Sequence, residues 1–246
     1  MRGFSAVVTG GAQGIGKGIA LALAGAGLRV VILDTNRRAG REAAAEIDGA
    51  VYVEGDTADE ADVVAAVREA NRGMSLYAAV ANAGIFTQGP LAKFSRKDWD
   101  RMLAVHLTGA FLLAKAAHRA LANNRGSLVL IASVRAAQAE PHWDAYCAAK
   151  GGLVGLTQSL AVSLAPRVRV NCVSPGWIPT EEWQESRRRT RPELSAEDQK
   201  LQPVGRVGTP DDIGALVRFL VSPEAGFITG AEVVADGGLS RKLPNT

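Results

Sequence analysis

The chain has 246 residues, with 28 Lys and Arg against 25 Asp and Glu, so its formal net charge is only +3. A hydrophobic content of 47% and a charged content of 22% exclude a disordered or fibrous chain, and the length suits one large domain. Such a weak charge, without basic residues interleaved with aromatics, argues against nucleic-acid binding.

Membrane and metal sites are also unsupported by the sequence. No apolar run reaches the roughly 18 residues of a membrane span, and the N-terminus leads into a strand-like segment instead of a signal pattern. Cys147 and Cys172 fit neither a CxxC motif nor a metal-ligand spacing. We therefore expect a cytoplasmic protein with no membrane partner, no disulfide framework and no metal.

The N-terminal segment has the order of a βαβ unit. An apolar strand at Phe4–Thr9 is followed by the turn G-G-A-Q-G-I-G (10–16), an apolar helix to about residue 26 and a strand at 28–33. Glycines let the backbone approach a pyrophosphate, and the start of the helix offers free N–H groups. The same glycines would also suit a turn that packs tightly under a helix without any ligand.

Asp34 ends the second strand, 18 residues after Gly16. A carboxylate there can accept hydrogen bonds from the ribose hydroxyls of an adenosine, and it repels a 2′-phosphate. The structural alternative is an N-cap for a helix that begins near Asn36. Together with the glycine turn, Asp34 predicts a dinucleotide site that favours NAD over NADP, although Arg37 and Arg38 lie close enough to complicate that preference.

The alternation of strands and helices continues along the chain. We expect further strands at 51–53, 76–81, 127–132, 168–173 and 232–234, and helices at 61–70, 98–121, 145–164 and 213–220. This order predicts an α/β fold, a parallel sheet covered on both faces, in a single domain over residues 1–246. The segment 181–200, rich in Glu, Arg and Gln, is predicted to be an exposed helical excursion that forms a lid over the substrate.

In a doubly wound sheet, ligands bind beyond the carboxyl ends of the strands. That rule brings the glycine turn, Asp34, Asp56, Asn82 and Ser133 to one edge. Asp56 can hold an adenine amino group. Asn82 can contact a ligand, but satisfying backbone groups at the strand end is an equally good role for it.

Tyr146 and Lys150 stand four residues apart, which places both on one face of a helix. Tyrosine has an ordinary pKa of about 10, too high for an efficient base near neutrality. A fixed positive charge favours the phenolate and lowers that pKa. A Tyr–Lys pair on a solvated helix face would have the same spacing, so its surroundings must decide.

Taken together, these motifs resemble those of the classical short-chain dehydrogenase/reductases. The resemblance extends from Thr9 to Gly238, and Ser133 lies 13 residues before Tyr146, the spacing usual in the family. The motifs are T-G-G-A-Q-G-I-G (9–16), Asp34, Asp56, N-A-G (82–84), Ser133, Y-C-A-A-K (146–150), N-C-V-S-P-G (171–176), Thr180 and D-G-G (236–238). The resemblance implies a single Rossmann-type domain with a seven-stranded parallel sheet, assembled as a homotetramer.

The resemblance also assigns roles. Tyr146 would be the general acid or base, Lys150 would bind the nicotinamide ribose and lower the tyrosine pKa, and Ser133 would orient the substrate oxygen. Ile178 and Thr180 would hold the carboxamide. The full set implied for cofactor binding is Gly10, Gln13, Gly14, Ile15, Gly16, Asp34, Asp56, Thr57, Asn82, Ala83, Gly84, Tyr146, Lys150, Pro175, Gly176, Ile178 and Thr180.

One position departs from the family pattern. The family carries Asn in an N-x-x-G context where this chain has V-H-L-T-G, with His106 in the Asn place. That Asn helps to hold a water that links the lysine to a proton relay. A neutral imidazole can also bond water, though its shape and titration differ. His106 is therefore a candidate catalytic residue. It could replace the Asn with an altered pH profile, the relay could be impaired with activity retained, or the protein could have little activity.

The substrate should lie between Ser133 and Tyr146, the 86–93 loop and the 181–200 lid. Glu140 and His142 favour a small polar substrate, such as a polyol, a sugar or a hydroxy acid, and Trp177 and Trp183 would add aromatic walls. The predicted function is an NAD-dependent oxidoreductase that interconverts a secondary alcohol and a ketone. The alternatives are a catalytically weak dinucleotide-binding regulatory protein and an NADP-dependent ketone reductase of the 3-oxoacyl type.

Overall fold

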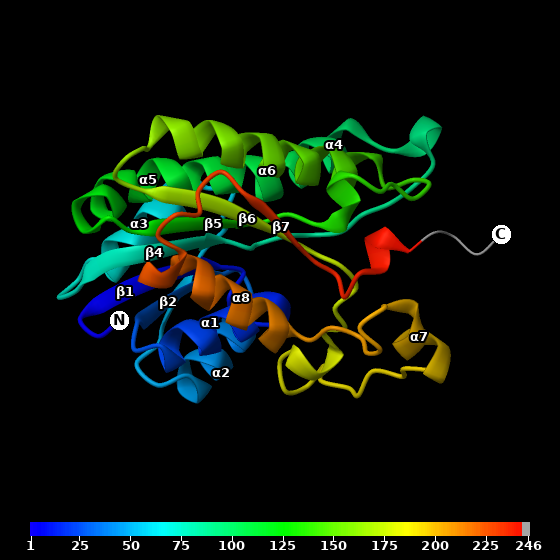
Figure 1. Ribbon diagram of the computed structural model, residues 1–246, viewed down its shortest axis with the longest axis horizontal. Coiled ribbons are helices and arrows are strands. Elements are labelled where there is room, and N and C mark those ends of the chain that lie inside the picture. The colour runs from blue at the N-terminus through cyan, green and yellow to red at the C-terminus, as the bar shows by residue number, and fades with distance from the viewer. Residues whose placement is uncertain (243–246) are drawn as a thin grey trace.

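Seven strands form one parallel sheet in the order β3-β2-β1-β4-β5-β6-β7 (Figure 1). The computed structural model describes residues 1–242, so the last four residues of the predicted domain lie outside it. The strands are β1 Phe4–Thr9, β2 Arg29–Asp34, β3 Val51–Glu54, β4 Ser75–Ala81, β5 Ser127–Ile131, β6 Arg169–Pro175 and β7 Glu232–Ala235. Each agrees with a predicted strand to within two residues at either end, and the predicted Rossmann-type fold is confirmed.

The strands are short and apolar because the sheet is covered on both faces, and successive side chains point to opposite faces. Val7, Val31 and Leu33 belong to one core, under the helices α3, α5 and α6. Ala6, Val30 and Ile32 belong to the other core, under α1, α2 and α8. Figure 1 shows these two helical layers above and below the sheet.

The helices are α1 Gly14–Gly25, α2 Arg37–Glu46, α3 Glu60–Ala70, α4 Arg96–Leu103, α5 Gly109–Asn124, α6 Asp144–Ser163, α7 Ala196–Leu201 and α8 Pro210–Val221.

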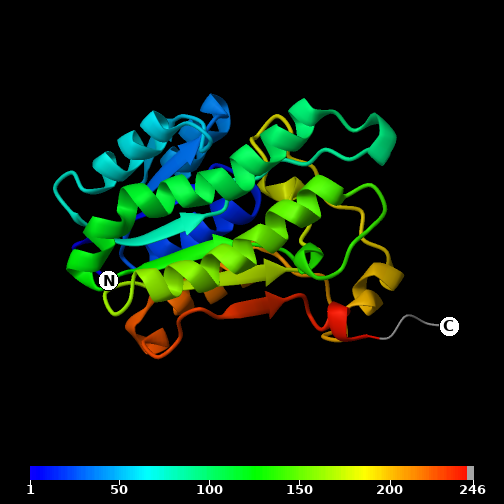
Figure 2. The same ribbon diagram turned by 90° about the horizontal axis from the view of Figure 1, so that it is seen from above.

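The order of the strands reverses at β1, which pairs with β2 on one side and with β4 on the other. Figure 2 shows α5 and α6 lying side by side over the sheet, roughly along the direction of its strands. In open parallel sheets a crevice forms beyond the carboxyl ends of the strands where the order reverses. The turns after β1 and β4 therefore flank the expected ligand site.

The predicted helix at 98–121 is in fact two helices joined by a π-helical turn. Residues Ala104–Thr108 form this turn between α4 and α5, and His106 is at its centre. Hydrophobic periodicity could not reveal the break, because a single wide turn changes the phase of the pattern only locally. Such turns are frequent at functional sites.

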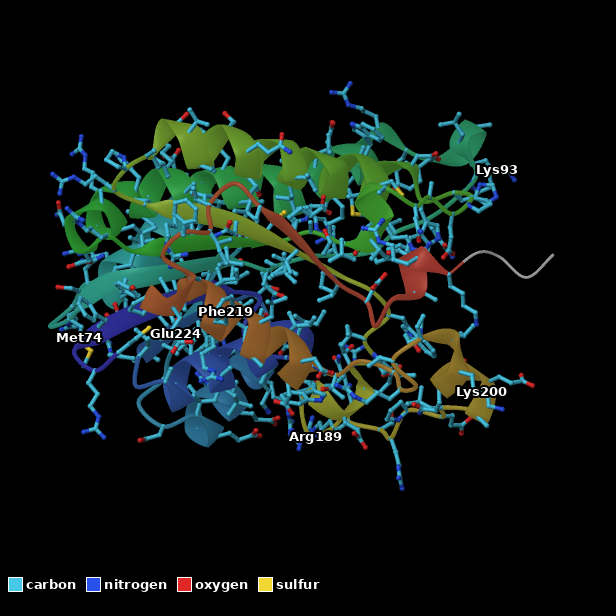
Figure 3. The ribbon with its side chains drawn as sticks, viewed as in Figure 1. Met74, Lys93, Arg189, Lys200, Phe219 and Glu224 are labelled. Carbon is cyan, nitrogen blue, oxygen red and sulfur yellow. The ribbon has the colours of Figure 1, made fainter. Side chains whose placement is uncertain are left out.

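The prediction of a helical excursion over 181–200 was wrong for most of its length. Only a 3-10 turn at Glu181–Trp183 and α7 are helical. Between them stand four arginines within five residues, followed by Pro192, and their mutual repulsion and the missing proline N–H disfavour a helix. Figure 3 labels Arg189 and Lys200, which mark this segment below the end of the sheet.

Further 3-10 turns cover Leu91–Lys93, Val134–Ala136, Pro223–Ala225 and Leu239–Arg241. Across the described part of the chain, no helix has both the length and the apolar character that a membrane crossing requires.

Candidate active site

A cavity of about 790 Å³ opens at the carboxyl ends of the strands. Its lining brings together nearly all of the cofactor and catalytic residues predicted from the sequence. Those residues are Gly10, Gln13, Ile15, Gly16, Asp34, Asp56, Thr57, Asn82, Ala83, Gly84, His106, Ser133, Tyr146, Lys150, Pro175, Gly176, Ile178 and Thr180. Gly14 is the one predicted glycine that does not line the cavity, although a Cβ on it would lie 3.3 Å from Cγ2 of Thr180, which does.

The glycine turn is built for close backbone approach. A Cβ on Gly16 would lie 2.0 Å from the carbonyl oxygen of Gly10, and Gly10 itself has a φ of +62°, which other residues rarely adopt. Helix α1 starts here without a side-chain cap and without an acidic residue in its first turn. Its uncapped N–H groups and positive dipole end suit a phosphate.

Gln13, the residue before α1, adds a further sign of a ligand. Its Oε1 is buried without a hydrogen-bond partner among the described residues, and the residue lines the cavity. Buried polar atoms are nearly always bonded. An amide oxygen accepts hydrogen bonds, so Gln13 would meet a hydroxyl or N–H donor of a ligand whose phosphate lies at the start of α1, as a dinucleotide could provide.

Asp34 fastens the glycine turn to the end of β2. Its carboxylate accepts a hydrogen bond from the N–H of Ala12 at 3.1 Å and another from the N–H of Asn36 at 2.9 Å. Burial raises the pKa of Asp34, and these backbone bonds oppose the rise. The N-cap of α2 is Asn36, whose side chain accepts from the N–H of Ala39. Asp34 is thus not needed as the helix cap.

Asn82 and Asp56 both have structural partners. The Asn82 amide donates to the carbonyl oxygens of Thr9 and Gly10, each at 3.0 Å, so it joins the end of β4 to the glycine turn. The Asp56 carboxylate forms an ion pair with Arg101 at 2.6 Å and accepts from the N–H of Ala58 at 2.9 Å. The backbone role weighed for Asn82 is therefore present, and Arg101, which the sequence did not single out, is the partner of Asp56.

Ser133, Tyr146 and Lys150 converge from two elements. Ser133 follows β5 and is buried, whereas Tyr146 and Lys150 occupy one face of α6, as their spacing predicted. The Lys150 ammonium lies 5.5 Å from the centre of the Tyr146 ring and donates to the carbonyl oxygen of Ile131 at 2.7 Å. Ser133 also influences Tyr146, because its hydroxyl acts to lower the pKa of the phenol.

The pKa of Tyr146 differs from the expectation that Lys150 would lower it. Burial raises the pKa of Tyr146, against smaller lowering effects of the Ser133 hydroxyl and the charge of Arg135. Burial also lowers the pKa of Lys150 to about 7. Because desolvation penalises a charge on either group, the phenol keeps its proton more firmly and the amine loses its own more readily.

His106 is buried at the floor of the cavity. Its Nε2 lies 2.8 Å from the carbonyl oxygen of Ile85 and 3.1 Å from the N–H of the same residue, so either neutral tautomer finds a partner there. Its Nδ1 is buried and has no partner among residues 1–242. Burial, reinforced by the charge of Lys150, lowers the pKa of His106 to about 3, so the imidazole is neutral.

Two aromatic residues line the cavity beside Tyr146. Phe86 belongs to the 86–93 loop that was predicted to border the substrate, and Trp143 to the loop with Glu140 and His142 that was predicted to line it. Both rings meet the Tyr146 ring edge-on, with centroids 5.5 Å and 5.7 Å away.

Four predicted substrate residues do not line the cavity. Glu140 pairs with Arg135, and His142 is exposed with a φ of +73°. Trp177 and Trp183 lie on the segment after β6, outside the lining. Within residues 1–242, no group of three or more His, Cys, Asp or Glu side chains could hold a metal ion.

Comparisons with known proteins agree with this geometry. A family model described as "Enoyl-(Acyl carrier protein) reductase" matches residues 10–240. The chain is 38% identical to 2-(S)-hydroxypropyl-CoM dehydrogenase 3 of Xanthobacter autotrophicus, over 95% of each chain. It is also 38% identical to L-fucose dehydrogenase of Oryctolagus cuniculus, over 94% of this chain and 83% of that one.

Solved structures show the same fold. An apo SCOR enzyme from Clostridium thermocellum superposes with a TM-score of 0.89 at 37% identity, covering 99% of this chain and 95% of that one. The sequence match covers nearly the whole chain, and the cavity holds the residues that the family motifs predicted; together they decide the family. The chain belongs to the classical short-chain dehydrogenase/reductases, oxidoreductases that act on hydroxyl groups with a nicotinamide dinucleotide.

Proposed function

We propose that the protein is an NAD-dependent dehydrogenase that interconverts a secondary alcohol and a ketone. The observation that carries the proposal is that Ser133, Tyr146 and Lys150 share one cavity with the glycine turn and Asp34. The dinucleotide, when bound, supplies or accepts the hydride. The residues of this chain then have to bind it, orient the substrate and handle a proton on oxygen.

Each residue has a definite task in this scheme. The hydroxyl of Ser133 bonds the substrate oxygen, and Tyr146 takes the alcohol proton in oxidation or gives one to the ketone in reduction. Lys150 contacts the nicotinamide ribose, and Ile178 and Thr180 hold the carboxamide. The buried, unbonded Nδ1 of His106 accepts a hydrogen bond at the cavity floor, so it continues the proton path that the usual Asn serves.

The preference for NAD is supported by the charges near the ribose position. Asp34 would accept the ribose hydroxyls and repel a 2′-phosphate. Arg37 and Arg38, the two cations that could favour NADP, are engaged by carboxylates: Arg37 pairs with Glu54 at 2.7 Å and Arg38 with Glu42 at 2.9 Å. Asp56 would contribute its remaining acceptor capacity at the adenine.

The substrate is proposed to be small and polar, such as a polyol, a sugar or a hydroxy acid. The names of the two relatives support a hydroxylated small molecule. A second candidate, NADPH-dependent reduction of a 3-oxoacyl group, is favoured by the apolar walls of Phe86 and Trp143 and by the description of the family model. A panel containing sugars, hydroxy acids and 3-oxoacyl-CoA probes separates the two.

We also infer a homotetramer and a cytoplasmic location. An apolar groove between α5 and α6, lined by Leu107, Phe111 and Leu156, lies open on the surface, as expected for a subunit contact. Both Cys147 and Cys172 are free, which suits a reducing compartment. Sedimentation of the wild type and of a Phe111→Glu variant tests the assembly, because a buried charge in the contact should dissociate it.

The catalytic proposal is tested with Tyr146→Phe. The variant should retain NADH binding and lose turnover of every active alcohol by at least about a hundredfold, because it removes only the proton-transferring oxygen. NADH binding without turnover in the wild type, across the whole panel, would instead favour the dinucleotide-binding regulatory protein.

A further inference from the structure

A second cation lies close to Tyr146 and was not expected from the sequence. Arg135 stands two residues after Ser133, in the 3-10 turn Val134–Ala136, and its N–H donates to the Ser133 hydroxyl at 3.1 Å. Its guanidinium lies 5.1 Å from the centre of the Trp143 ring and forms an ion pair with Glu140. A stacked and paired guanidinium is held in one place.

Trp143 connects this cation to the phenol. Its ring meets the Tyr146 ring edge-on, at 5.7 Å between centroids, so Trp143 packs against both the guanidinium and the Tyr146 ring. The Arg135 side chain is only 27% exposed, so water screens its charge incompletely. Its charge lowers the pKa of Tyr146, against the larger effect of burial.

The other groups around Tyr146 are poorly suited to stabilise a phenolate. Cys147 on α6 acts in the opposite direction, and His106 from the π turn is neutral. The neighbouring part of α4 is apolar. Burial lowers the pKa of Lys150 to about 7, so its ammonium loses charge as the pH rises above neutrality. A guanidinium stays charged throughout this range.

We propose that Arg135, held in place by Glu140 and Trp143, adds a permanent positive charge that favours deprotonated Tyr146 during the reaction. The assignment rests on the proposed role of Tyr146 as the base. Arg135 acts on the phenol through space and makes no contact with the reacting atoms. Glu140, placed at the substrate by the sequence, instead fixes Arg135 and partly offsets its charge.

The titration of Tyr146 can be observed directly, without a substrate. The chain has 3 tyrosines, so 13C labelling at tyrosine Cζ gives three resonances. The resonance that disappears in Tyr146→Phe is that of Tyr146. We expect the Tyr146 midpoint to rise by about 0.5 to 1 pH unit in Arg135→Met and to return close to the wild-type value in Arg135→Lys. The measurement is made on the protein alone and repeated with saturating NAD.

Glu140→Gln tests the effect of the Arg135 charge by removing the carboxylate that partly offsets it. It keeps an oxygen to accept from Arg135 but removes the offsetting negative charge, so the Tyr146 midpoint should fall by a few tenths of a pH unit. Tyr52, on β3, is the internal control and should keep its midpoint. The opposite signs of the two shifts separate an electrostatic effect from a general loosening of the loop.

Three results would overturn the proposal: equal midpoints in Arg135→Met and the wild type, shifts of the same sign in Arg135→Met and Glu140→Gln, or a wild-type Tyr146 that stays protonated to pH 11 with NAD present. If Arg135→Met fails to fold, Glu140→Gln still decides, because an unchanged or raised midpoint contradicts the assignment. Failure of the proposed function is recorded separately, as NADH binding without alcohol turnover, and leaves the titration unaffected.

Discussion

Burial governs the protonation of the residues at the floor of the site. It raises the pKa of Tyr146, lowers that of Lys150 to about 7 and lowers that of His106 to about 3. Hydrogen bonds and nearby charges also change these three pKa values, but they do not reverse the direction that burial sets. The spacing of Tyr146 and Lys150 correctly predicted their common helix face, but sequence spacing carries no information about desolvation, so the direction of the tyrosine shift could not be predicted.

The shifted pKa of His106 makes stability depend on pH. The pKa of about 3 in the folded state lies below the ordinary value of 6.5, so between these values the unfolded chain binds a proton that the folded chain does not. The free energy of unfolding should therefore decrease as the pH is lowered below about 6.5. Between pH 7 and pH 5 this loss amounts to about 2 kcal/mol for one such group.

Urea unfolding of the wild type and of His106→Asn at both pH values tests this. The variant lacks the titrating group, so its loss of stability between pH 7 and pH 5 should be smaller than that of the wild type by about 2 kcal/mol. His118→Asn is the matched control, because His118 is only partly buried, and it should behave as the wild type does. Equal losses in the wild type and His106→Asn would contradict the assigned burial.

At the scale of elements, the glycine turn and the start of α1 form one unit whose shape depends on a missing side chain. A Cβ on Gly16 would collide with the Gly10 carbonyl oxygen, whereas a Cβ on Gly25, at the other end of the same helix, meets nothing within 4 Å. We expect Gly16→Ala to lower the melting temperature and to weaken NADH binding at least tenfold. Gly25→Ala should leave binding unchanged and be neutral or slightly stabilising. Calorimetry and fluorescence titration of the two variants provide the test; NADH binding preserved in Gly16→Ala would exclude a phosphate at this turn.

The segment 181–200, which was predicted to form a lid, is attached to α2 by a small set of hydrogen bonds. The Glu42 carboxylate accepts from the N–H of Ser186 at 2.7 Å and from its hydroxyl at 2.8 Å, and Arg189 approaches Glu46 at 3.5 Å. Glu42→Ala should therefore speed hydrogen–deuterium exchange of residues 184–191 with little change in melting temperature, because these bonds hold an exposed segment. Asp48→Ala, in the loop after α2, is the control. Unchanged exchange in Glu42→Ala would mean that other contacts hold the segment.

For the whole molecule, the arrangement of strands decides which distant residues meet. The sequence predicted the seven strands and their alternation with helices, and the rule for parallel sheets then placed the turn after β1, Asp34 and Ser133 at one edge. These predictions succeeded because each rests on backbone spacing and apolar pattern. The π turn at His106 and the pairing of Arg135 with Glu140 depend on local backbone conformation and side-chain packing, which leave no periodic signal.

In the proposed function, this edge of the sheet is an NAD site organised by Asp34. This proposal is tested most directly by fluorescence titration of NADH and NADPH with the wild type, Asp34→Ala and Glu54→Gln; Glu54 is the neighbour of Asp34 on β3. We predict that the wild type binds NADH more tightly than NADPH and that Asp34→Ala loses about tenfold to a hundredfold of its NADH affinity. NADH affinity should be unchanged in Glu54→Gln. Tighter binding of NADPH by the wild type, or an Asp34→Ala variant that binds NADH as well as the wild type does, would contradict the account.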